Sequence, residues 1–364
     1  MGVPLAGHLY PMAALIDAAA RAGHEVSVLT GTGGADLLPH HRVVEAGPSV
    51  REAMAETSRR LGGIDGSQPG AGPVELFGGV RLDLGADAVL DAVRGLPVDL
   101  VVGEMTEQLA PLVAAAVGAP YVEFVVSAPL PTELVTAIHA RAAVTFEERH
   151  LRRPATLAVI DPFPRILMSD QERVAAADHW PVRPTVYAEP GTAHPDLGLQ
   201  PGAPVALVSL GTSVDDPGTE VALITDLAHA GLQVIATGRR GVEAADQGHP
   251  HVYSAGFVPL EHLLPLADVV VSAGGTGTVL AALSAGLPLV IRPFLADQPW
   301  NAARLSAAGV AIAIDDTADA GQAALRVLKD PSYRTAAAEV AAAITATDDA
   351  DAVVGRLTAL VGRG

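Results

Sequence analysis

The chain alternates between two kinds of segment along its 364 residues. Short runs of apolar, often β-branched residues are typical of buried strands, and the longer stretches between them are rich in alanine and leucine, which favour helices. Continuous apolar strands that alternate with helices indicate parallel sheets covered by helices on both faces. The pattern therefore predicts an α/β protein of the doubly wound kind.

The predicted strands form two series. The first half contains strands over 24–30, 99–103 and 120–126, with helices over 11–21 and 110–117. The second half contains strands over 205–210, 233–236, 267–271, 289–291 and 310–314. Each half is long enough for a domain with its own core. We therefore expect two Rossmann-like domains that face each other across a cleft, where such sheets bind ligands at the carboxyl ends of their strands.

Residues 181–204 separate the two series. They include six prolines and three glycines, a composition typical of a linker. We place the boundary so that the N-terminal domain covers 1–194 and the C-terminal domain covers 195–364, and we leave open whether the last helix returns to the N-terminal domain. Because Pro4 interrupts the opening Met-Gly-Val-Pro-Leu, the usual first strand is expected to be stunted, or missing through a late start of the sequence.

Composition narrows the choice of partners. The formal net charge of −18 repels nucleic acid, so an anionic ligand must be held by local groups such as helix N-termini. Disulfides and cysteine-ligated metals are excluded because the sequence has no cysteine. No export signal or membrane-spanning run is recognisable, which predicts a cytoplasmic protein without integral membrane contact. The sequence leaves open whether the chain forms a homodimer.

The strongest functional signal is a glycine-rich turn after a predicted strand. The strand over 269–272 leads into Ser-Ala-Gly-Gly-Thr-Gly-Thr (272–278), and a helix begins near Thr276. Gly274, Gly275 and Gly277 let a ligand approach the backbone, while the helix amides and the hydroxyls of Thr276 and Thr278 can hold a diphosphate.

A polar pair follows the next strand. Asp297 and Gln298 lie on the loop after 289–291, and together they offer donors and acceptors that suit sugar hydroxyls. The alternative is a plain strand-turn-helix in which the glycines serve packing. A glycine-rich turn by itself would favour that alternative. Here the turn is one of a series of motifs spaced along residues 256–309, and the whole series favours a donor site. The series also includes Gly256-Phe257-Val258-Pro259, Gly286-Leu287-Pro288, Gly309 and Asn301, the only asparagine of the chain.

These motifs resemble the donor-binding signature of the inverting glycosyltransferases of the UDP-glycosyltransferase superfamily (GT-B fold), especially the bacterial enzymes that decorate natural products. The resemblance covers most of the chain and is weakest over 47–90 and 127–183. Four further stretches are similar to family segments: Gly7-His8-Leu9-Tyr10-Pro11 with Gly23-His24-Glu25-Val26, Asp99-Leu100-Val101-Val102, Gly118-Ala119-Pro120, and Ser209-Leu210-Gly211-Thr212.

The resemblance implies that His8 is the catalytic base. An acceptor oxygen must lose its proton as it attacks, and a histidine has a pKa suited to taking it. Glu104 stands where the family's acidic partner is expected, and Glu107 is a second candidate. The alternatives are that His8 only braces its turn and that Glu104 is a charge at a helix N-terminus.

The resemblance also implies how the donor is held. The expected co-substrate is a dTDP- or UDP-linked sugar, bound without a metal, with Phe257 and Val258 beside the nucleobase. The expected donor-binding residues are Gly211, Thr212, Ser213, Phe257, Val258, Gly274, Gly275, Thr276, Gly277, Thr278, Asp297 and Gln298.

One position departs from the family. Ala273 stands where a histidine usually contacts the donor phosphate. A charged hydrogen bond of this kind contributes about 1.5–3 kcal/mol, so we expect weaker diphosphate binding, compensated in part by nearby amides and hydroxyls.

Three other functions compete with this prediction. An NAD-dependent oxidoreductase needs a Gly-x-Gly-x-x-Gly turn after the first strand, and the glycines at 31–34 have the wrong spacing. A nucleotide-sugar epimerase of the same architecture and an inactive auxiliary partner of a glycosyltransferase stay open. We predict a metal-independent inverting glycosyltransferase of the hexosyltransferase type that moves a (deoxy)sugar to a small hydrophobic natural product.

Overall fold

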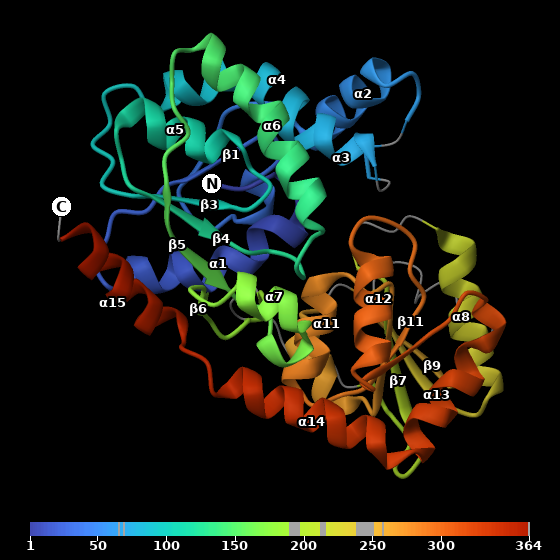
Figure 1. Cartoon of the computed structure of the whole chain (residues 1–364). Coiled ribbons are helices and arrows are strands. Elements are labelled where there is room, and N and C mark those ends of the chain that lie inside the picture. The colour runs from blue at the N-terminus through green and yellow to red at the C-terminus, as the bar shows by residue number, and fades with distance from the viewer. Residues whose placement is uncertain are drawn as a thin grey trace. The chain divides into compact units, whose positions relative to one another are not determined.

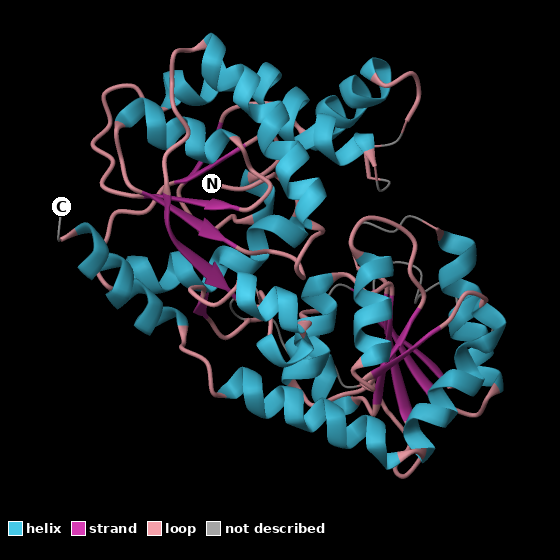
Figure 2. Cartoon of the chain, in the orientation of Figure 1, coloured by secondary structure: helices cyan, strands magenta, loops and turns pink. Residues whose placement is uncertain are grey.

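The computed structural model describes residues 1–64, 66–67, 70–188, 197–211, 216–237, 251–256 and 258–362. They form two compact units (Figures 1 and 2). Unit 1 contains Met1–Phe163, Asp170–Arg183 and the chain from Asp348 onward, and unit 2 contains Pro164–Ser169 and Pro184–Thr347. The contacts thus change unit after Arg183, and the boundary predicted at 194/195 falls outside the described residues.

Unit 2 is built on a sheet of six parallel strands in the order β12-β11-β10-β7-β8-β9. The strands are β7 (Val205–Ser209), β8 (Gln233–Thr237), β9 (Val252–Gly256), β10 (Val269–Ser272), β11 (Leu289–Ile291) and β12 (Ala311–Ala313). This is the Rossmann order, in which the direction of winding reverses between the first and fourth strands, here β7 and β10. The loops after these two strands therefore lie at the position where such sheets bind ligands.

Helices cover this sheet on both faces. They are α8 (Pro217–His229), α10 (Leu260–Leu263), α11 (Thr276–Ser284), α12 (Gln298–Ala307), α13 (Ala320–Lys329) and α14 (Pro331–Thr345). Helices α8 and α13 pack on a core that includes Val208, Val271 and Val290, all fully buried. Strands β7, β10 and β11 are almost wholly apolar because both of their faces are covered, which is what the apolar runs in the sequence predicted.

Unit 1 contains parallel strands β3 (Val101–Glu104), β4 (Tyr121–Phe124), β5 (Thr156–Asp161) and β6 (Trp180–Pro181), and a parallel pair β1 (Val28–Thr30) and β2 (Val43–Glu45). Residues 1–3 lie between the two groups. Gly2 forms a parallel bridge with Thr30, and the N–H of Glu104 donates to Met1 O at 3.0 Å. The first strand is therefore only three residues long, and the winding order matches that of unit 2.

The helices of unit 1 are α1 (Ala6–Arg21), α2 (Val50–Arg60), α3 (Ala71–Glu75), α4 (Arg81–Ala92), α5 (Leu109–Val117), α6 (Thr132–Glu148), α7 (Asp170–Ala175) and α15 (Ala350–Val361). The last helix, α15, lies beside α1 (Figure 1), where Arg21 pairs with the Asp351 carboxylate at 3.0 Å and Val353 joins the core around Met12. No helix among the described residues has the length and apolarity needed to cross a bilayer.

Several elements differ from the sequence-based expectations. Helix α1 begins at Ala6 rather than at residue 11, so one turn precedes Pro11 and His8 is helical. Strand β1 begins at Val28 rather than at residue 24, because residues 24–27 are largely exposed and have no partner strand to bury them against. Strands β2, β5, β6 and β9 were not predicted, since β6 has only two residues and the other three mix polar with apolar residues over a short length.

A π-helical turn, η2 (Leu76–Val80), connects α3 to α4 and packs closely against α6. A Cβ on Gly78 would lie 2.5 Å from the Ile138 carbonyl oxygen, and one on Gly79 would lie 2.7 Å from the Arg141 guanidinium. At Gly78, where the neighbour is backbone, only glycine allows this approach, whereas the Arg141 side chain could move away from a methyl group on residue 79. π-Helical turns interrupt regular helices and often mark functional sites.

We expect Gly78→Ala to lower the free energy of unfolding by about 1–3 kcal/mol, because the added methyl group overlaps the backbone of α6. Urea denaturation monitored by circular dichroism measures the change. Gly355→Ala in α15 is the matched control, because a Cβ there meets nothing within 4 Å and alanine favours a helix. Equal stability of the two variants would contradict the close packing of η2 on α6.

Candidate active site

His8 lies in the first turn of α1, directly after the three-residue first strand. Glu104 is the last residue of β3, the strand that neighbours residues 1–3. In a doubly wound sheet the winding direction reverses between these two strands. The topology therefore brings together two residues that are 96 positions apart in the sequence, at the carboxyl edge of the sheet.

The two side chains are hydrogen-bonded. His8 Nδ1 lies 3.0 Å from Glu104 Oε1, the Glu104 side chain is fully buried, and that of His8 is 20% exposed. Because the carboxylate only accepts, Nδ1 carries the proton. Nε2 then has a free lone pair, and it has no hydrogen-bond partner among the described residues.

Further donors satisfy the buried carboxylate. The N–H of Thr106 donates to Glu104 Oε2 at 2.7 Å and its hydroxyl to Oε1 at 2.8 Å, while the N–H of Val3 lies 3.4 Å from Oε1. Burial raises the pKa of Glu104, but the charge and hydrogen bond of His8 and the bonds from Thr106 lower it overall. The carboxylate is therefore ionised.

The pKa of His8 is set by opposing effects. Burial lowers it, but the charge of Glu104 and the hydrogen bond to it raise it, so that the pKa lies above its ordinary value of 6.5. The charge of Arg81 lowers it and that of Glu107 raises it by smaller amounts. Such an imidazole binds its proton more tightly than a free histidine does.

Glu107, the second candidate partner, does not reach His8. It forms an ion pair with Arg81 at 2.5 Å, and both side chains are only 1% exposed. The apolar wall beside the imidazole is Phe77 of η2, whose ring centroid lies 6.1 Å from that of His8. Neither Arg81 nor Phe77 was identified from the sequence, because both lie in the segment where no motif is recognisable.

In unit 2 the glycine-rich turn follows β10, as predicted. Gly274 has a φ of 88°, and a Cβ there would lie 2.8 Å from Ile291, so the position requires glycine. Gly275 is the N-cap of α11, which begins at Thr276. Gly277 is exposed and Thr278 half-buried, so that the first turn of the helix offers its amides to a ligand.

A buried side chain connects this turn to the Asp297 loop. Asn301 Nδ2 lies 2.9 Å from Gly274 O, 3.1 Å from Thr276 Oγ1 and 3.0 Å from Asp297 Oδ2, and the Thr276 hydroxyl donates to Asp297 Oδ2 at 2.7 Å. Asn301 is 2% exposed. Its identity as the only asparagine was the sequence signal, but its contacts could not be read from the sequence.

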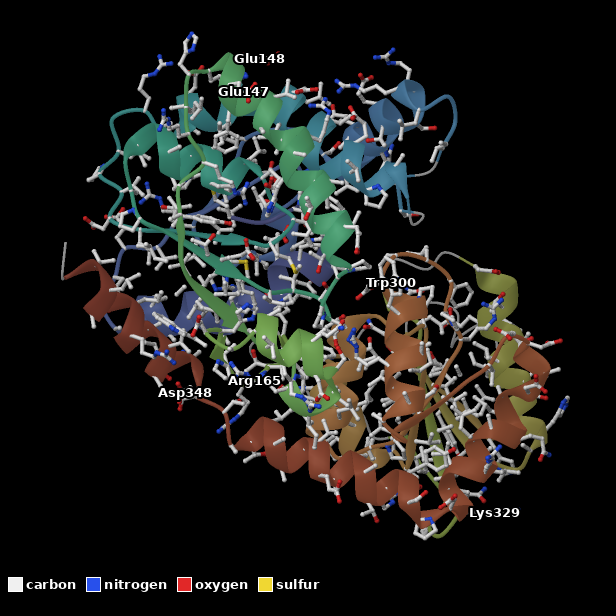
Figure 3. All side chains as sticks on the ribbon, in the orientation of Figure 1. Glu147, Glu148, Arg165, Trp300, Lys329 and Asp348 are labelled. Carbon is white, nitrogen blue, oxygen red and sulfur yellow. The ribbon has the colours of Figure 1, made fainter. Side chains whose placement is uncertain are left out.

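Gln298 is 4% exposed, and its Oε1 accepts from the N–H groups of Phe294 and Leu295 at 2.9 and 3.0 Å. The carboxamide oxygen therefore braces the loop after β11. Asp297, in contrast, is half-buried, and its side-chain hydrogen bonds within the described part of the chain, from Thr276 and Asn301, both engage Oδ2. Half-buried Trp300 lies in the first turn of α12 (Figure 3).

Two of the remaining candidates follow strands of the same sheet. Gly211 follows β7 with a φ of 79° and is exposed, and Val258 is half-buried after β9. Thr212, Ser213 and Phe257 lie outside the described residues. Ala273 is 1% exposed and belongs to the core of unit 2. A larger side chain at that position would have to displace core neighbours.

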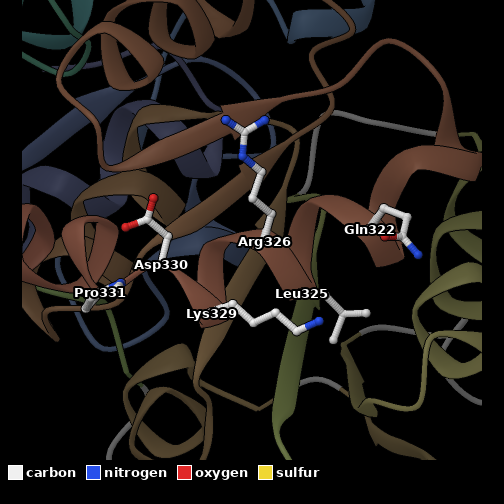
Figure 4. A pocket seen from close by; sticks show the side chains of 6 residues that line it. All are labelled: Gln322, Leu325, Arg326, Lys329, Asp330 and Pro331. Atoms are coloured by element: carbon white, nitrogen blue, oxygen red, sulfur yellow. The ribbon is translucent and has the colours of Figure 1, made fainter.

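A hollow of about 530 Å³ on unit 2 lies away from these residues (Figure 4). Its lining residues are Gln322, Leu325, Arg326, Lys329, Asp330 and Pro331. Arg334, on the helix that begins there, reaches the backbone of Asp268 at 3.4 Å, and Asp268 immediately precedes β10. The hollow is therefore at the amino ends of the strands, opposite the glycine-rich turn.

Comparison with known proteins defines the class. The family described as "Erythromycin biosynthesis protein CIII-like, C-terminal domain" matches residues 223–360. L-demethylnoviosyl transferase of Streptomyces niveus is 30% identical over 336 residues, which are 87% of this chain and 84% of that protein.

Two solved structures share the fold. The glycosyltransferase SsfS6 of Streptomyces sp. SF2575, complexed with thymidine diphosphate, has a TM-score of 0.81 at 24% identity, with 98% of each chain covered. The spinosyn rhamnosyltransferase SpnG, complexed with spinosyn aglycone, has a TM-score of 0.80 at 21% identity, with 98% of this chain and 100% of that chain covered.

The fold is thus that of the GT-B glycosyltransferases, which confirms the predicted class of two Rossmann-like domains. The chain belongs to the bacterial natural-product glycosyltransferases of the erythromycin CIII-like type.

We expect Asn301→Ala to weaken the binding of thymidine diphosphate and to lower the free energy of unfolding by about 1–3 kcal/mol, because the buried Gly274 carbonyl oxygen loses a donor and Asp297 Oδ2 keeps, among the described residues, only that of Thr276. Calorimetry and thermal denaturation measure the two effects. Ser306→Ala, at an exposed position of the same helix, is the control. Unchanged affinity in a destabilised Asn301→Ala would mean that this side chain serves folding alone.

Proposed function

We propose that the chain transfers a deoxysugar from a dTDP-sugar to a hydroxyl of a small, hydrophobic natural-product acceptor, with inversion at the anomeric carbon. The observation that carries the proposal is the hydrogen bond from His8 Nδ1 to buried Glu104, which leaves Nε2 as a lone-pair acceptor on a partly exposed ring. This is the arrangement of a general base held in one tautomer by a carboxylate.

In this mechanism Nε2 removes the proton of the acceptor hydroxyl while the oxygen attacks the anomeric carbon. The bond between that carbon and the diphosphate oxygen breaks on the opposite face of the sugar, and the nucleotide diphosphate departs. The proton remains on His8. Because Glu104 stays ionised, it stabilises the imidazolium that forms and keeps the ring oriented.

The departing diphosphate is held, in our proposal, by groups of unit 2. The first amides of α11, the hydroxyl of Thr278 and the loop after β7 at Gly211 would stabilise the negative charge without a metal ion. Asp297 would use its remaining oxygen, and Gln298 its amide nitrogen, to bind hydroxyls of a hexosyl group. Thr212, Ser213, Phe257 and Val258 complete the proposed donor set.

The relatives support this choice of substrates. SsfS6 is solved with thymidine diphosphate and SpnG, a rhamnosyltransferase, with its aglycone, while the curated relative transfers an L-demethylnoviosyl group. Mixing the pure protein with dTDP-sugars and candidate aglycones, and following the release of thymidine diphosphate together with product mass, tests the proposal. A nucleotide-sugar epimerase would convert the donor without an acceptor, and an inactive auxiliary partner would release nothing.

His8→Ala should lower the turnover by about 10²–10⁴-fold, the usual contribution of a positioned general base. The affinity for thymidine diphosphate should not change, because the proposed donor residues belong to the other unit. His24→Ala is the control, since His24 is exposed and its side chain hydrogen-bonds Thr358, away from the His8–Glu104 pair. Near-normal turnover of His8→Ala with an O-linked acceptor would refute the base role.

The pH dependence follows from the raised pKa of His8. The base must be neutral, so kcat/KM should fall as the pH is lowered through a midpoint above 6.5. Glu104→Gln removes the largest effect that raises the pKa, and its acid limb should therefore move to lower pH while the maximal rate decreases. A pH-rate profile of both proteins measures this. An acid limb that is identical in the two would separate Glu104 from the titrating group.

A further inference from the structure

The buried ion pair of Arg81 and Glu107 has an unusual hydrogen-bond inventory. Arg81 Nη2 donates to Glu107 Oε2 at 2.5 Å, and the other carboxylate oxygen lies 3.3 Å from the N–H of Leu109. The Arg81 Nε and Nη1 atoms are buried and have no hydrogen-bond partner among the described residues. A guanidinium that is 1% exposed thus uses only part of its donor capacity.

This arrangement is a poor way to stabilise a fold. Moving two charges out of water costs free energy that their attraction seldom offsets, and unpartnered buried donors add to the cost. An apolar pair of similar volume would serve packing equally well. The retention of the charge therefore requires another explanation, and the immediate surroundings provide one.

The ion pair is attached to the His8–Glu104 dyad from two sides. The N–H of Glu107 donates to the backbone oxygen of Glu104 at 3.0 Å, so that Glu107 belongs to the turn between β3 and α5 that carries Thr106. Phe77 precedes Arg81 by one helical turn and lies beside the His8 ring. The same face of η2 and α4 therefore presents the aromatic ring to His8 and the guanidinium to Glu107.

The charged groups around His8 come from each neighbouring element. β3 provides Glu104, the following turn provides Glu107, and α4 provides Arg81. The amino group of Met1 donates to the Val102 carbonyl oxygen on the same strand. Among the side chains, Arg81 is the cation that opposes the two carboxylates.

We propose that Arg81 is a positioning residue for His8: it holds the β3–α5 turn in place through Glu107 and sets a fixed positive charge beside the imidazole. This inference rests on the proposed base role of His8. Without the guanidinium, His8 would face two carboxylates alone and would retain its proton to higher pH. The effect of Arg81 on the pKa of His8 has this sign, since its charge lowers the value that Glu104 raises.

The test is a titration of the His8 imidazole by NMR in the full chain, with carbon-13-labelled histidine and the His8 signal assigned from its loss in His8→Ala. In Arg81→Met the pKa of His8 should rise by about 0.5–1 unit, and the acid limb of kcat/KM should move with it. Arg81→Lys keeps the charge and should remain near the wild type. Arg149→Met is the matched control. Arg149, at the end of α6, also pairs with a carboxylate, but its partner is the exposed Asp87 of α4.

An unchanged His8 pKa in a folded Arg81→Met, or the same rise in Arg81→Lys as in Arg81→Met, would overturn the proposal. If Arg81→Met does not fold, the double variant Arg81→Met/Glu107→Leu replaces the pair with apolar side chains, which such sites tolerate. Its His8 pKa should still rise, by less, since the weaker raising effect of Glu107 is lost as well; a fall or no change refutes the idea. The NMR result needs no turnover, so it stands apart from a failure of the base role.

Discussion

The proposed active site of unit 1 depends on the hydrogen bonds that satisfy the buried carboxylate of Glu104. A charge with no exposed surface must be satisfied by donors, and its donors come from three separate segments. Val3 belongs to the three-residue first strand, His8 to the first turn of α1, and Thr106 to the turn before α5. Satisfying one carboxylate therefore fixes the start of the chain, the orientation of the proposed base and the turn beside it. The short first strand has few ladder hydrogen bonds of its own, and the carboxylate adds to them.

In unit 2 a neutral buried side chain, rather than a charged one, connects the separate loops of the proposed site. Asn301 donates to Gly274, Thr276 and Asp297 from a buried position, and it thereby connects the turn after β10 to the loop after β11. An amide suits this place because the proposed ligand is an anion. The Asp297 carboxylate already lies beside the first residue of α11. A second carboxylate in place of Asn301 would add to the charge that repels a diphosphate, whereas the amide adds none. With Ala273 packed into the core, the helix amides and neutral hydroxyls are the groups left for that charge near β10.

The sequence was sufficient for the architecture and for the residues whose role is local. Uninterrupted apolar runs predicted the strands from β7 to β12 except β9, and the glycine-rich stretch located the start of α11 at Thr276. The sequence was insufficient for element boundaries and residue roles that depend on tertiary contacts. The start of α1 depends on Leu5 and the first strand, and the choice between Glu104 and Glu107 depends on Arg81, which comes from a segment without recognisable motifs. The bracing role of Gln298 depends on a loop conformation that its neighbours in sequence do not specify.

These contacts also bear on how strong a base His8 can be. A base that is too weak does not take the proton, and one that binds its proton too tightly is already protonated at working pH, so the useful pKa lies near that pH. Glu104 orients the His8 ring, but both its charge and its hydrogen bond raise the pKa of His8. Burial and the Arg81 charge act in the opposite direction. These two effects therefore limit how far a carboxylate at 3.0 Å raises the pKa of the imidazole, provided that the opposing groups remain fixed. The π-helical turn fixes them, since Gly78 and Gly79 let η2 approach α6 closely enough to hold Phe77 and Arg81 over the dyad.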